Sequence, residues 1–104
     1  MGRLSEHFVA SVSDVVPGAT ARVTVDGVDI LLCNVGGDIF AIADVCTHDG
    51  APLDQGTLDG ACVTCPRHGA VFDVRTGEAL ALPAFLPVLT FPVRVEAGNV
   101  LVDL

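Results

Sequence analysis

The sequence is poor in basic residues. Only five Lys+Arg stand against thirteen Asp+Glu, which gives a formal net charge of −8. Nucleic-acid binding needs basic patches that meet the phosphates, so this charge balance argues against nucleic acid as a partner. An acidic surface is typical of a small protein that docks on basic surfaces, although acidity also simply keeps a protein soluble. We expect no nucleic-acid partner.

Long hydrophobic runs are missing as well, although 51% of the residues are apolar. The apolar residues come in short runs, and none reaches the roughly 18 residues of a membrane helix. The first residues, MGRLSEHFVASVSD, contain no apolar segment of the length found in a signal peptide. We therefore expect a cytoplasmic protein without a membrane partner. The apolar content argues against disorder, and the length predicts a single domain, 1–104, with its own hydrophobic core.

Helical periodicity is also absent. Turn signals such as Asp26-Gly27 and Asp59-Gly60 recur every eight to twelve residues and separate short β-branched runs such as VDILLCNV. This pattern is typical of an all-β sandwich or barrel. At most, a short turn of helix is expected in LSEHFVA (4–10) or in LDQGTLDG (53–60).

The middle of the chain differs in composition from its two ends. From about Asp44 to Pro83 the sequence is richer in Gly, Pro, Cys and His, whereas the flanking segments resemble regular strands. We therefore expect an antiparallel β-sandwich or barrel scaffold formed by 1–43 and 84–104. A small β subdomain, 44–83, would be inserted between them and would carry the functional site.

Two scarce residue types are concentrated in this middle segment. The chain has four cysteines and three histidines, and two of each lie in CTHDGA (46–51) and CPRHGA (65–70), which look like imperfect copies of each other. The candidate ligands follow a C-x-H-x16-C-x2-H pattern and are Cys46, His48, Cys65 and His68. Without a secretory signal, grouped Cys and His residues indicate metal binding more than disulfides.

Three chemistries could use these four residues. A structural Cys2His2 zinc site is one, although zinc fingers usually open with a C-x2-C or C-x4-C knuckle and pair like ligands. Cys–His nucleophilic catalysis is another, but it leaves the duplicated pair unexplained. The third is a Rieske-type [2Fe–2S] cluster, in which two histidines replace two cysteines on one iron. Two loops side by side would then each supply one Cys and one His, and Gly50 and Gly69 would permit the tight turns that bring amides to the sulfides.

The spacing and its Gly-Ala flanks resemble the Rieske iron–sulfur family. CPRHGAVFDVRTGEAL, the following LPAFLPVLTFPVRVEAGNVLV, and GDIFAIADVCTHDGAPLDQGTLDG are similar to the small Rieske ferredoxins that feed aromatic-ring dioxygenases, whereas about the first 25 residues carry no specific signal. The resemblance implies the Rieske fold with a cluster-binding subdomain and one [2Fe–2S] cluster. The thiolate-bound iron would be buried and the histidine-bound iron outermost. LPAFLP (82–87) resembles the proline-containing loop that covers the cluster.

Three positions distinguish this chain from respiratory Rieske proteins. Ala51 and Arg67 stand where those proteins carry the cysteines of a cross-loop disulfide, and Ala70 stands where they carry a serine that bonds to sulfur. The chain also has no tyrosine to act as a second donor. Fewer donors stabilise the reduced cluster less, which predicts a potential near the low end of the range from about −150 to +300 mV. Asp49 would lower the potential if it faces the cluster, and Arg67 would oppose it.

The resemblance implies an electron carrier and not an enzyme. Once the four ligands are assigned only His7 remains, which does not supply the two histidines of a mononuclear oxygenase iron. Single electrons would pass from a flavin-dependent ferredoxin reductase to a terminal non-haem iron oxygenase, through an exposed tip at His48 and His68 of a monomer. The alternatives are a small Rieske subunit of an assimilatory nitrite reductase, a ferredoxin linked to iron–sulfur assembly, and, less favoured, a structural Cys2His2 zinc module.

Two cysteines remain outside the ligand set. Cys62 and Cys65 form a C-x2-C, but in a strand their side chains would point to opposite faces. We therefore expect Cys62 to be a small buried apolar residue. Cys33, in the middle of ILLCNV, is expected in the core.

Overall fold

The computed structural model describes residues 6–104, which form eleven β-strands and one short 3-10 helix. The elements in chain order are β1 (Glu6–Ser11), η1 (Val12–Asp14), β2 (Thr20–Val25), β3 (Val28–Val35), β4 (Asp38–Ala43), β5 (Thr57–Asp59), β6 (Cys62–Thr64), β7 (Val71–Asp73), β8 (Ala79–Ala81), β9 (Thr90–Phe91), β10 (Val93–Glu96) and β11 (Asn99–Asp103). The prediction of an all-β fold is confirmed.

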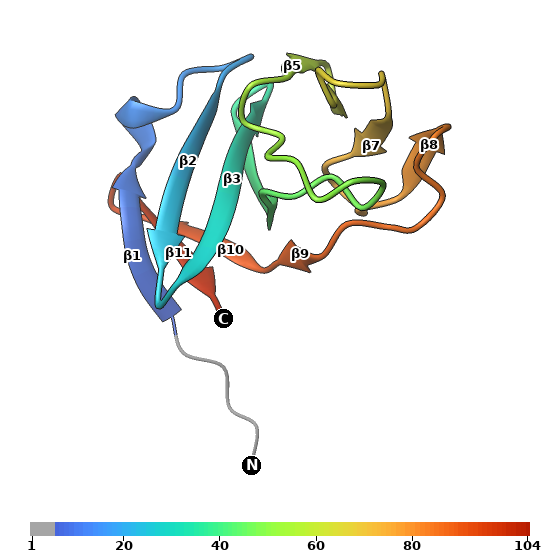
Figure 1. Ribbon diagram of the computed structural model, residues 1–104. Helices are drawn as coiled ribbons and strands as arrows, with labels where there is room; N and C mark the ends of the chain where they lie inside the picture. Colours follow the sequence, from blue (N-terminus) through green and yellow to red (C-terminus); the bar gives the residue numbers. More distant parts are fainter. Residues whose placement is uncertain (1–5) are drawn as a thin grey trace.

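The strands form three antiparallel sheets. Their orders are β1-β11-β10, β2-β3-β4-β9 and β5-β6-β7-β8. Figure 1 shows the small third sheet beside the other two, with the chain returning from β8 through β9 to β10 beneath it. Strand β9 pairs with β4, so the chain returns to the second sheet after it has formed the third.

The expected helical turns lie elsewhere. Most of 4–10 is β1, with residues 4 and 5 outside the described part of the chain, and 53–60 holds turns and β5. The 3-10 helix instead follows β1 directly, where the backbone N–H of Ser11 donates to Asp14 Oδ2 at 3.0 Å. This capping interaction gives a side-chain partner to an amide at the start of the helix, and it favours one tight turn.

Strand β3 lies between two hydrophobic clusters. Leu31 and Cys33 point into one cluster, whereas Ile30 and Leu32 point into the other, and all four side chains are fully buried. Alternate residues of a strand face opposite sides of a sheet, so a strand covered on both faces reads as a continuous apolar run. This is why ILLC lacks polar alternation. It also confirms the core position expected for Cys33.

The first of these clusters reaches into the segment that carries the candidate ligands. Cys46 and Cys65 pack in it together with Leu53, Val63 and Phe72. The two thiols therefore pack in the same hydrophobic cluster as the Leu31 and Cys33 side chains of β3. Among residues 6–104, no helix is long and apolar enough to cross a membrane.

Candidate metal centre

The predicted ligands lie on two loops that start from different kinds of support. The first loop, 46–51, follows β4 after two residues and leads towards β5. The second loop, 65–70, joins β6 to β7, whose end residues Thr64 and Val71 are paired across the ladder. The second loop is thus the closed end of a hairpin, whereas the first is a longer connection between two sheets.

The two loops nevertheless have matching backbone hydrogen bonds. In each, the cysteine N–H donates to the carbonyl of the alanine that ends the loop, at 2.7 Å in both cases. The N–H of the loop glycine donates to the cysteine carbonyl, at 2.7 Å from Gly50 and 3.1 Å from Gly69. Both glycines have φ of +77°, a conformation that other residues rarely adopt. The positive φ predicted for these glycines is confirmed.

The loops bring like side chains together at two levels. Cys46 and Cys65 are each only 1% exposed, and their sulfur atoms and a carboxylate oxygen of Asp49 lie within 4.8 Å of one another. His48 and His68 are exposed, with ring centroids 5.3 Å apart and planes at 87°. The structure therefore forms a buried thiol pair beneath an exposed imidazole pair.

This arrangement fits two metal ions better than one. A tetrahedral zinc ion, with bonds of about 2.3 Å to sulfur and about 2.0 Å to nitrogen, holds neighbouring ligand atoms about 3.5 Å apart. Within residues 6–104, no histidine nitrogen belongs to the group of atoms that gathers around the two sulfurs. A two-iron cluster needs such a separation, because its thiolates and imidazoles bind different irons.

Backbone amides face the buried sulfur of the first loop. The pKa of the Cys46 thiol is raised above its usual value, mainly by burial, and hydrogen bonds from the amides of His48 and Asp49 partly oppose this rise. These donors would stabilise negative charge on the sulfur once the thiol has lost its proton to a metal. The tight loop thus supplies part of the electrostatic environment that a charged cluster needs.

Asp49 spans the two loops. Its Oδ1 accepts the N–H of Ala51 at 3.0 Å, and its Oδ2 lies 3.4 Å from both Arg67 Nε and His68 Nδ1. The hydrogen bond from the Ala51 amide, followed by the charge of Arg67, holds the pKa of Asp49 below its usual value. The two charges whose opposing effects on the potential were expected from the sequence are therefore paired with each other, so that they partly cancel.

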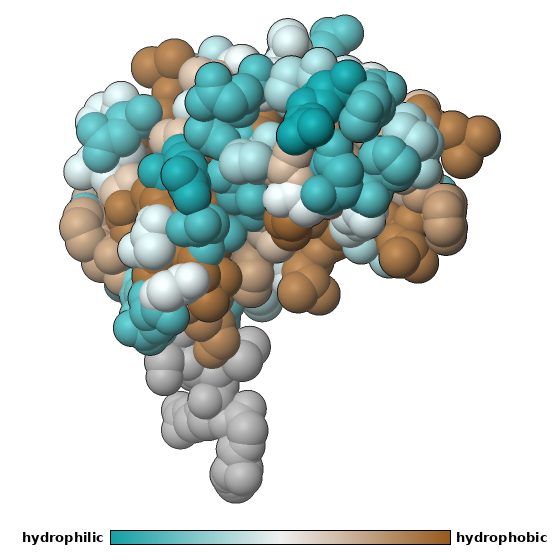
Figure 2. Space-filling view, in the orientation of Figure 1, coloured by the Kyte–Doolittle hydropathy of each residue, from teal (hydrophilic) through white to brown (hydrophobic). Residues whose placement is uncertain are grey.

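An apolar surface adjoins the imidazole pair. The segment 82–89 exposes Leu82 and Phe85 by 77% and 78%, and Leu86 and Leu89 are exposed as well. Figure 2 shows hydrophobic surface at the edge of the molecule where this segment runs from β8 to β9. The hydroxyl of Thr47 donates to the carbonyl of Leu86 at 2.7 Å, which ties the segment to the first loop. No pattern in the sequence predicts this hydrogen bond, because it joins residues 39 positions apart.

The remaining cysteines lie outside the site. Burial raises the pKa of Cys33 to about 12. Cys62 is only half-buried, so the expectation of a buried side chain is wrong. It opposes Asp73 on β7 and is the first residue of the three-residue strand β6. Among the described residues, the thiol of Cys62 does not belong to the group of ligand atoms formed by Cys46, Asp49 and Cys65.

Comparison with known proteins identifies close relatives. Residues 5–92 match the family model of the Rieske [2Fe-2S] domain. The ferredoxin subunit of 3-phenylpropionate/cinnamic acid dioxygenase from Escherichia coli (strain K12) is 45% identical over 102 residues, covering 97% of this chain and 95% of the relative. The ferredoxin component of biphenyl 2,3-dioxygenase from Rhodococcus jostii (strain RHA1) is 46% identical over 96 residues, covering 92% and 90%.

Solved structures agree with these matches. The complex of reduced oxygenase and oxidized ferredoxin in carbazole 1,9a-dioxygenase contains a chain that superposes with a TM-score of 0.90 at 38% identity, covering 94% of this chain and 92% of that chain. A putative small subunit of an NADPH nitrite reductase superposes with a TM-score of 0.80 at 22% identity, covering 95% and 98%, which shows a shared fold alone. From its family match and its near full-length relatives, the chain belongs to the Rieske [2Fe–2S] domain family, whose cofactor is one Rieske cluster.

Proposed function

We propose that this protein is the ferredoxin component of an aromatic-ring dioxygenase system and carries single electrons to a terminal oxygenase. The observation that carries the proposal is the layered site, with a buried thiol pair beneath an exposed imidazole pair. Such a site keeps one end of a cluster dry and offers the other end to a docking protein. The relatives are ferredoxin components of dioxygenase systems, so the protein would carry electrons and leave the bond chemistry to the oxygenase.

The proposed ligands divide between the two irons. Cys46 and Cys65 would hold the inner iron, and His48 and His68 the outer one. The bound cluster supplies a site that takes up and gives up one electron. As neutral ligands, the imidazoles of His48 and His68 would place less negative charge on the iron they hold than thiolates would, which would favour reduction at that end of the cluster. Their exposed rings would shorten the electron path to a partner.

We further propose the division of the chain into a scaffold, 1–43 and 84–104, and a cluster-binding subdomain, 44–83. The support is the sheet order, because β5 to β8 pair only with one another in the described part of the chain. Both cluster loops lead into or out of this sheet. The shared hydrophobic cluster beneath the thiols joins the subdomain to the scaffold.

The proposed docking surface consists of His48, His68 and the segment 82–89. Its apolar side chains would exclude water around the imidazoles when a partner binds. The oxygenase in the carbazole dioxygenase complex is bound by a ferredoxin, and we extend that kind of partner to this chain. A flavin-dependent ferredoxin reductase would supply the electrons to a monomeric, cytoplasmic carrier. The formal charge of −8 would speed encounter with basic partner surfaces.

The test has a spectroscopic and a functional arm. Electron paramagnetic resonance of the dithionite-reduced protein should give the low average g value of mixed His/Cys ligation. With NADH, a dioxygenase ferredoxin reductase and its terminal oxygenase, addition of the protein should restore substrate oxidation. A colourless protein that holds one zinc ion would contradict the cofactor assignment. A normal spectrum without transfer to any dioxygenase oxygenase would contradict the partner assignment alone.

A further inference from the structure

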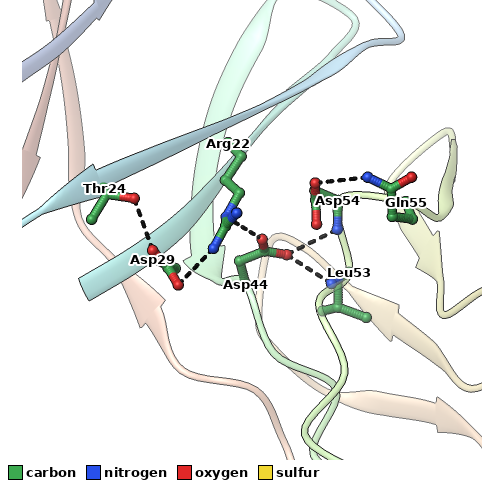
Figure 3. A network of polar contacts seen from close by, with 7 residues as sticks. All are labelled: Arg22, Thr24, Asp29, Asp44, Leu53, Asp54 and Gln55. Atoms are coloured by element: carbon green, nitrogen blue, oxygen red, sulfur yellow. Dashed lines mark hydrogen bonds and ion pairs between the residues drawn. The ribbon is translucent and has the colours of Figure 1, made fainter. Parts of the chain in front are cut away.

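The carboxylate of Asp44 is buried directly beneath the first loop. Asp44 follows β4 and precedes Cys46 by two residues, and its side chain has no exposed surface. Its Oδ1 accepts two backbone hydrogen bonds, from Leu53 N at 2.7 Å and from Asp54 N at 2.9 Å. Figure 3 shows this carboxylate pointing from the end of β4 towards the two amides. One oxygen therefore joins the chain just before the first loop to the chain just after it.

The other oxygen faces the scaffold. Oδ2 of Asp44 lies 3.0 Å from Nε of Arg22 on β2, as an ion pair without the alignment of a hydrogen bond. Arg22 in turn donates to Asp29 on β3 at 2.7 Å, and the hydroxyl of Thr24 donates to the same carboxylate at 2.8 Å (Figure 3). The backbone N–H of Asp44 also donates to the carbonyl of Asp29 at 3.0 Å. The carboxylate thus has a fixed position relative to two strands of the second sheet.

This arrangement costs free energy of folding, which indicates that the geometry it fixes serves a purpose. A fully buried carboxylate loses its hydration, and one guanidinium must serve both Asp44 and Asp29. The outer pair between Arg22 and Asp29 is about half exposed, and exposed pairs of this kind add little stability by themselves. What the network does provide is a fixed distance between 44 and 53, which are the two ends of the segment that carries Cys46 and His48.

We propose that Asp44, oriented by Arg22, is a positioning residue that clamps the first loop and so sets how firmly Cys46 and His48 hold the cluster against the second loop. The inference rests on the proposed ligand assignment. Among residues 6–104, no buried carboxylate bonds in this way to the ends of the second loop, whose flanking residues Thr64 and Val71 are instead paired across the β6–β7 ladder. The clamp therefore supplies for the first loop what a strand ladder supplies for the second.

The test compares variants of the purified holoprotein by two measurements. Asp44→Ala removes the acceptor of the hydrogen bonds from the Leu53 and Asp54 amides, whereas Asp44→Asn retains an oxygen that can accept both. Loss of hydrogen bonds to a charged group predicts that Asp44→Ala speeds amide hydrogen exchange of the peptide containing Leu53 and Asp54 by at least about tenfold. Release of iron to a chelator should accelerate by a similar factor. Asp44→Asn should lie between Asp44→Ala and the unaltered protein in both measurements.

A matched control comes from the scaffold. Arg94 also pairs with two carboxylates, those of Glu6 and Glu96, but on the sheet of β1, β11 and β10. Arg94→Gln should leave exchange at Leu53 and iron release within about twofold of the unaltered protein, since the pairs it removes are exposed. A control variant that released iron as fast as Asp44→Ala would overturn the proposal.

A milder variant covers the case in which Asp44→Ala does not fold. Asp29→Asn leaves Asp44 and the hydrogen bonds that it accepts in place, and it removes only the negative charge that orients Arg22. It should speed iron release less than Asp44→Ala, in the same direction. Unchanged exchange and release in the variants that fold, or exchange that rises equally in the core strands β3 and β4, would overturn the clamp. If the protein proved to hold zinc, the ligand assignment would fail, but the exchange of the Leu53 peptide would still decide whether Asp44 closes the loop.

Discussion

The first and second loops reach the same backbone conformation by different means. Both have the same two hydrogen bonds around their cysteine and a glycine at φ of +77°. The second loop is held by the β6–β7 ladder, whereas the first is closed through the buried Asp44. Similar sequence motifs therefore determine the local turn, and the anchoring comes from residues outside the motifs. The loops should respond alike to changes within the turn and differently to changes in what surrounds it.

The largest expected effect is the loss of one histidine from either loop. If each loop supplies one imidazole to the outer iron, His48→Ala and His68→Ala should each abolish the low-g resonance of the reduced protein. His7→Ala is the control, because His7 lies on β1, away from both loops, where its Nε2 lies 3.7 Å from a carboxylate oxygen of Asp26. His7→Ala should leave the spectrum unchanged. A spectrum that survived in only one of the two loop variants would show that the loops are not equivalent ligand donors.

The next effect concerns the two loop glycines. A Cβ at Gly50 or Gly69 would meet no atom within 4 Å, so the cost of Gly→Ala is that of the backbone conformation alone. That cost is about 1 to 2 kcal/mol for an L-residue with positive φ. Both variants should lower the midpoint of thermal cofactor loss by a similar amount. Gly36→Ala in the turn between β3 and β4, also at positive φ and also free of contacts, should destabilise the fold while leaving the resonance unchanged.

Features that depend on neighbouring residues were readily predicted from the sequence. The short β-branched runs predicted an all-β fold, and the two Gly-Ala turns predicted positive φ at their glycines. Contacts between distant segments were not predictable in this way. Asp44 looks like an ordinary loop residue until β2 and β3 bring Arg22 and Asp29 beside it. The exposure of Cys62 likewise depends on which face of the small sheet is covered.

A smaller effect should distinguish the alanines that end the two loops. Ala70 is fully buried, whereas Ala51 is partly exposed. A serine hydroxyl at Ala70 would have little water to bond with and should donate towards the cluster, as the resemblance to respiratory proteins implies. A hydrogen bond that is stronger by about 1 kcal/mol to the reduced than to the oxidised cluster would raise a one-electron potential by about 40 mV. Ala51→Ser should raise it less, because water competes for that hydroxyl.

A redox titration followed by electron paramagnetic resonance measures both potentials. Equal shifts in Ala70→Ser and Ala51→Ser would mean that burial does not control the strength of the new donor. No shift in either would show that the low potential expected from the missing hydroxyls has another cause.

The smallest effect tests the residue that follows each cysteine. The first loop has Thr47, whose hydroxyl holds the carbonyl of Leu86, whereas the second has the exposed Pro66, which has no side-chain donor. Thr47→Val retains the shape of the side chain and removes one partly exposed hydrogen bond, worth about 0.5 to 1 kcal/mol. Amide exchange in the segment 82–89 should therefore rise about two- to fivefold. Pro66→Ala should leave that exchange unchanged. Equal increases of amide exchange in Thr47→Val and Pro66→Ala would mean that the attachment of the segment 82–89 depends on the stability of the whole site. The first loop alone would then not anchor the docking surface.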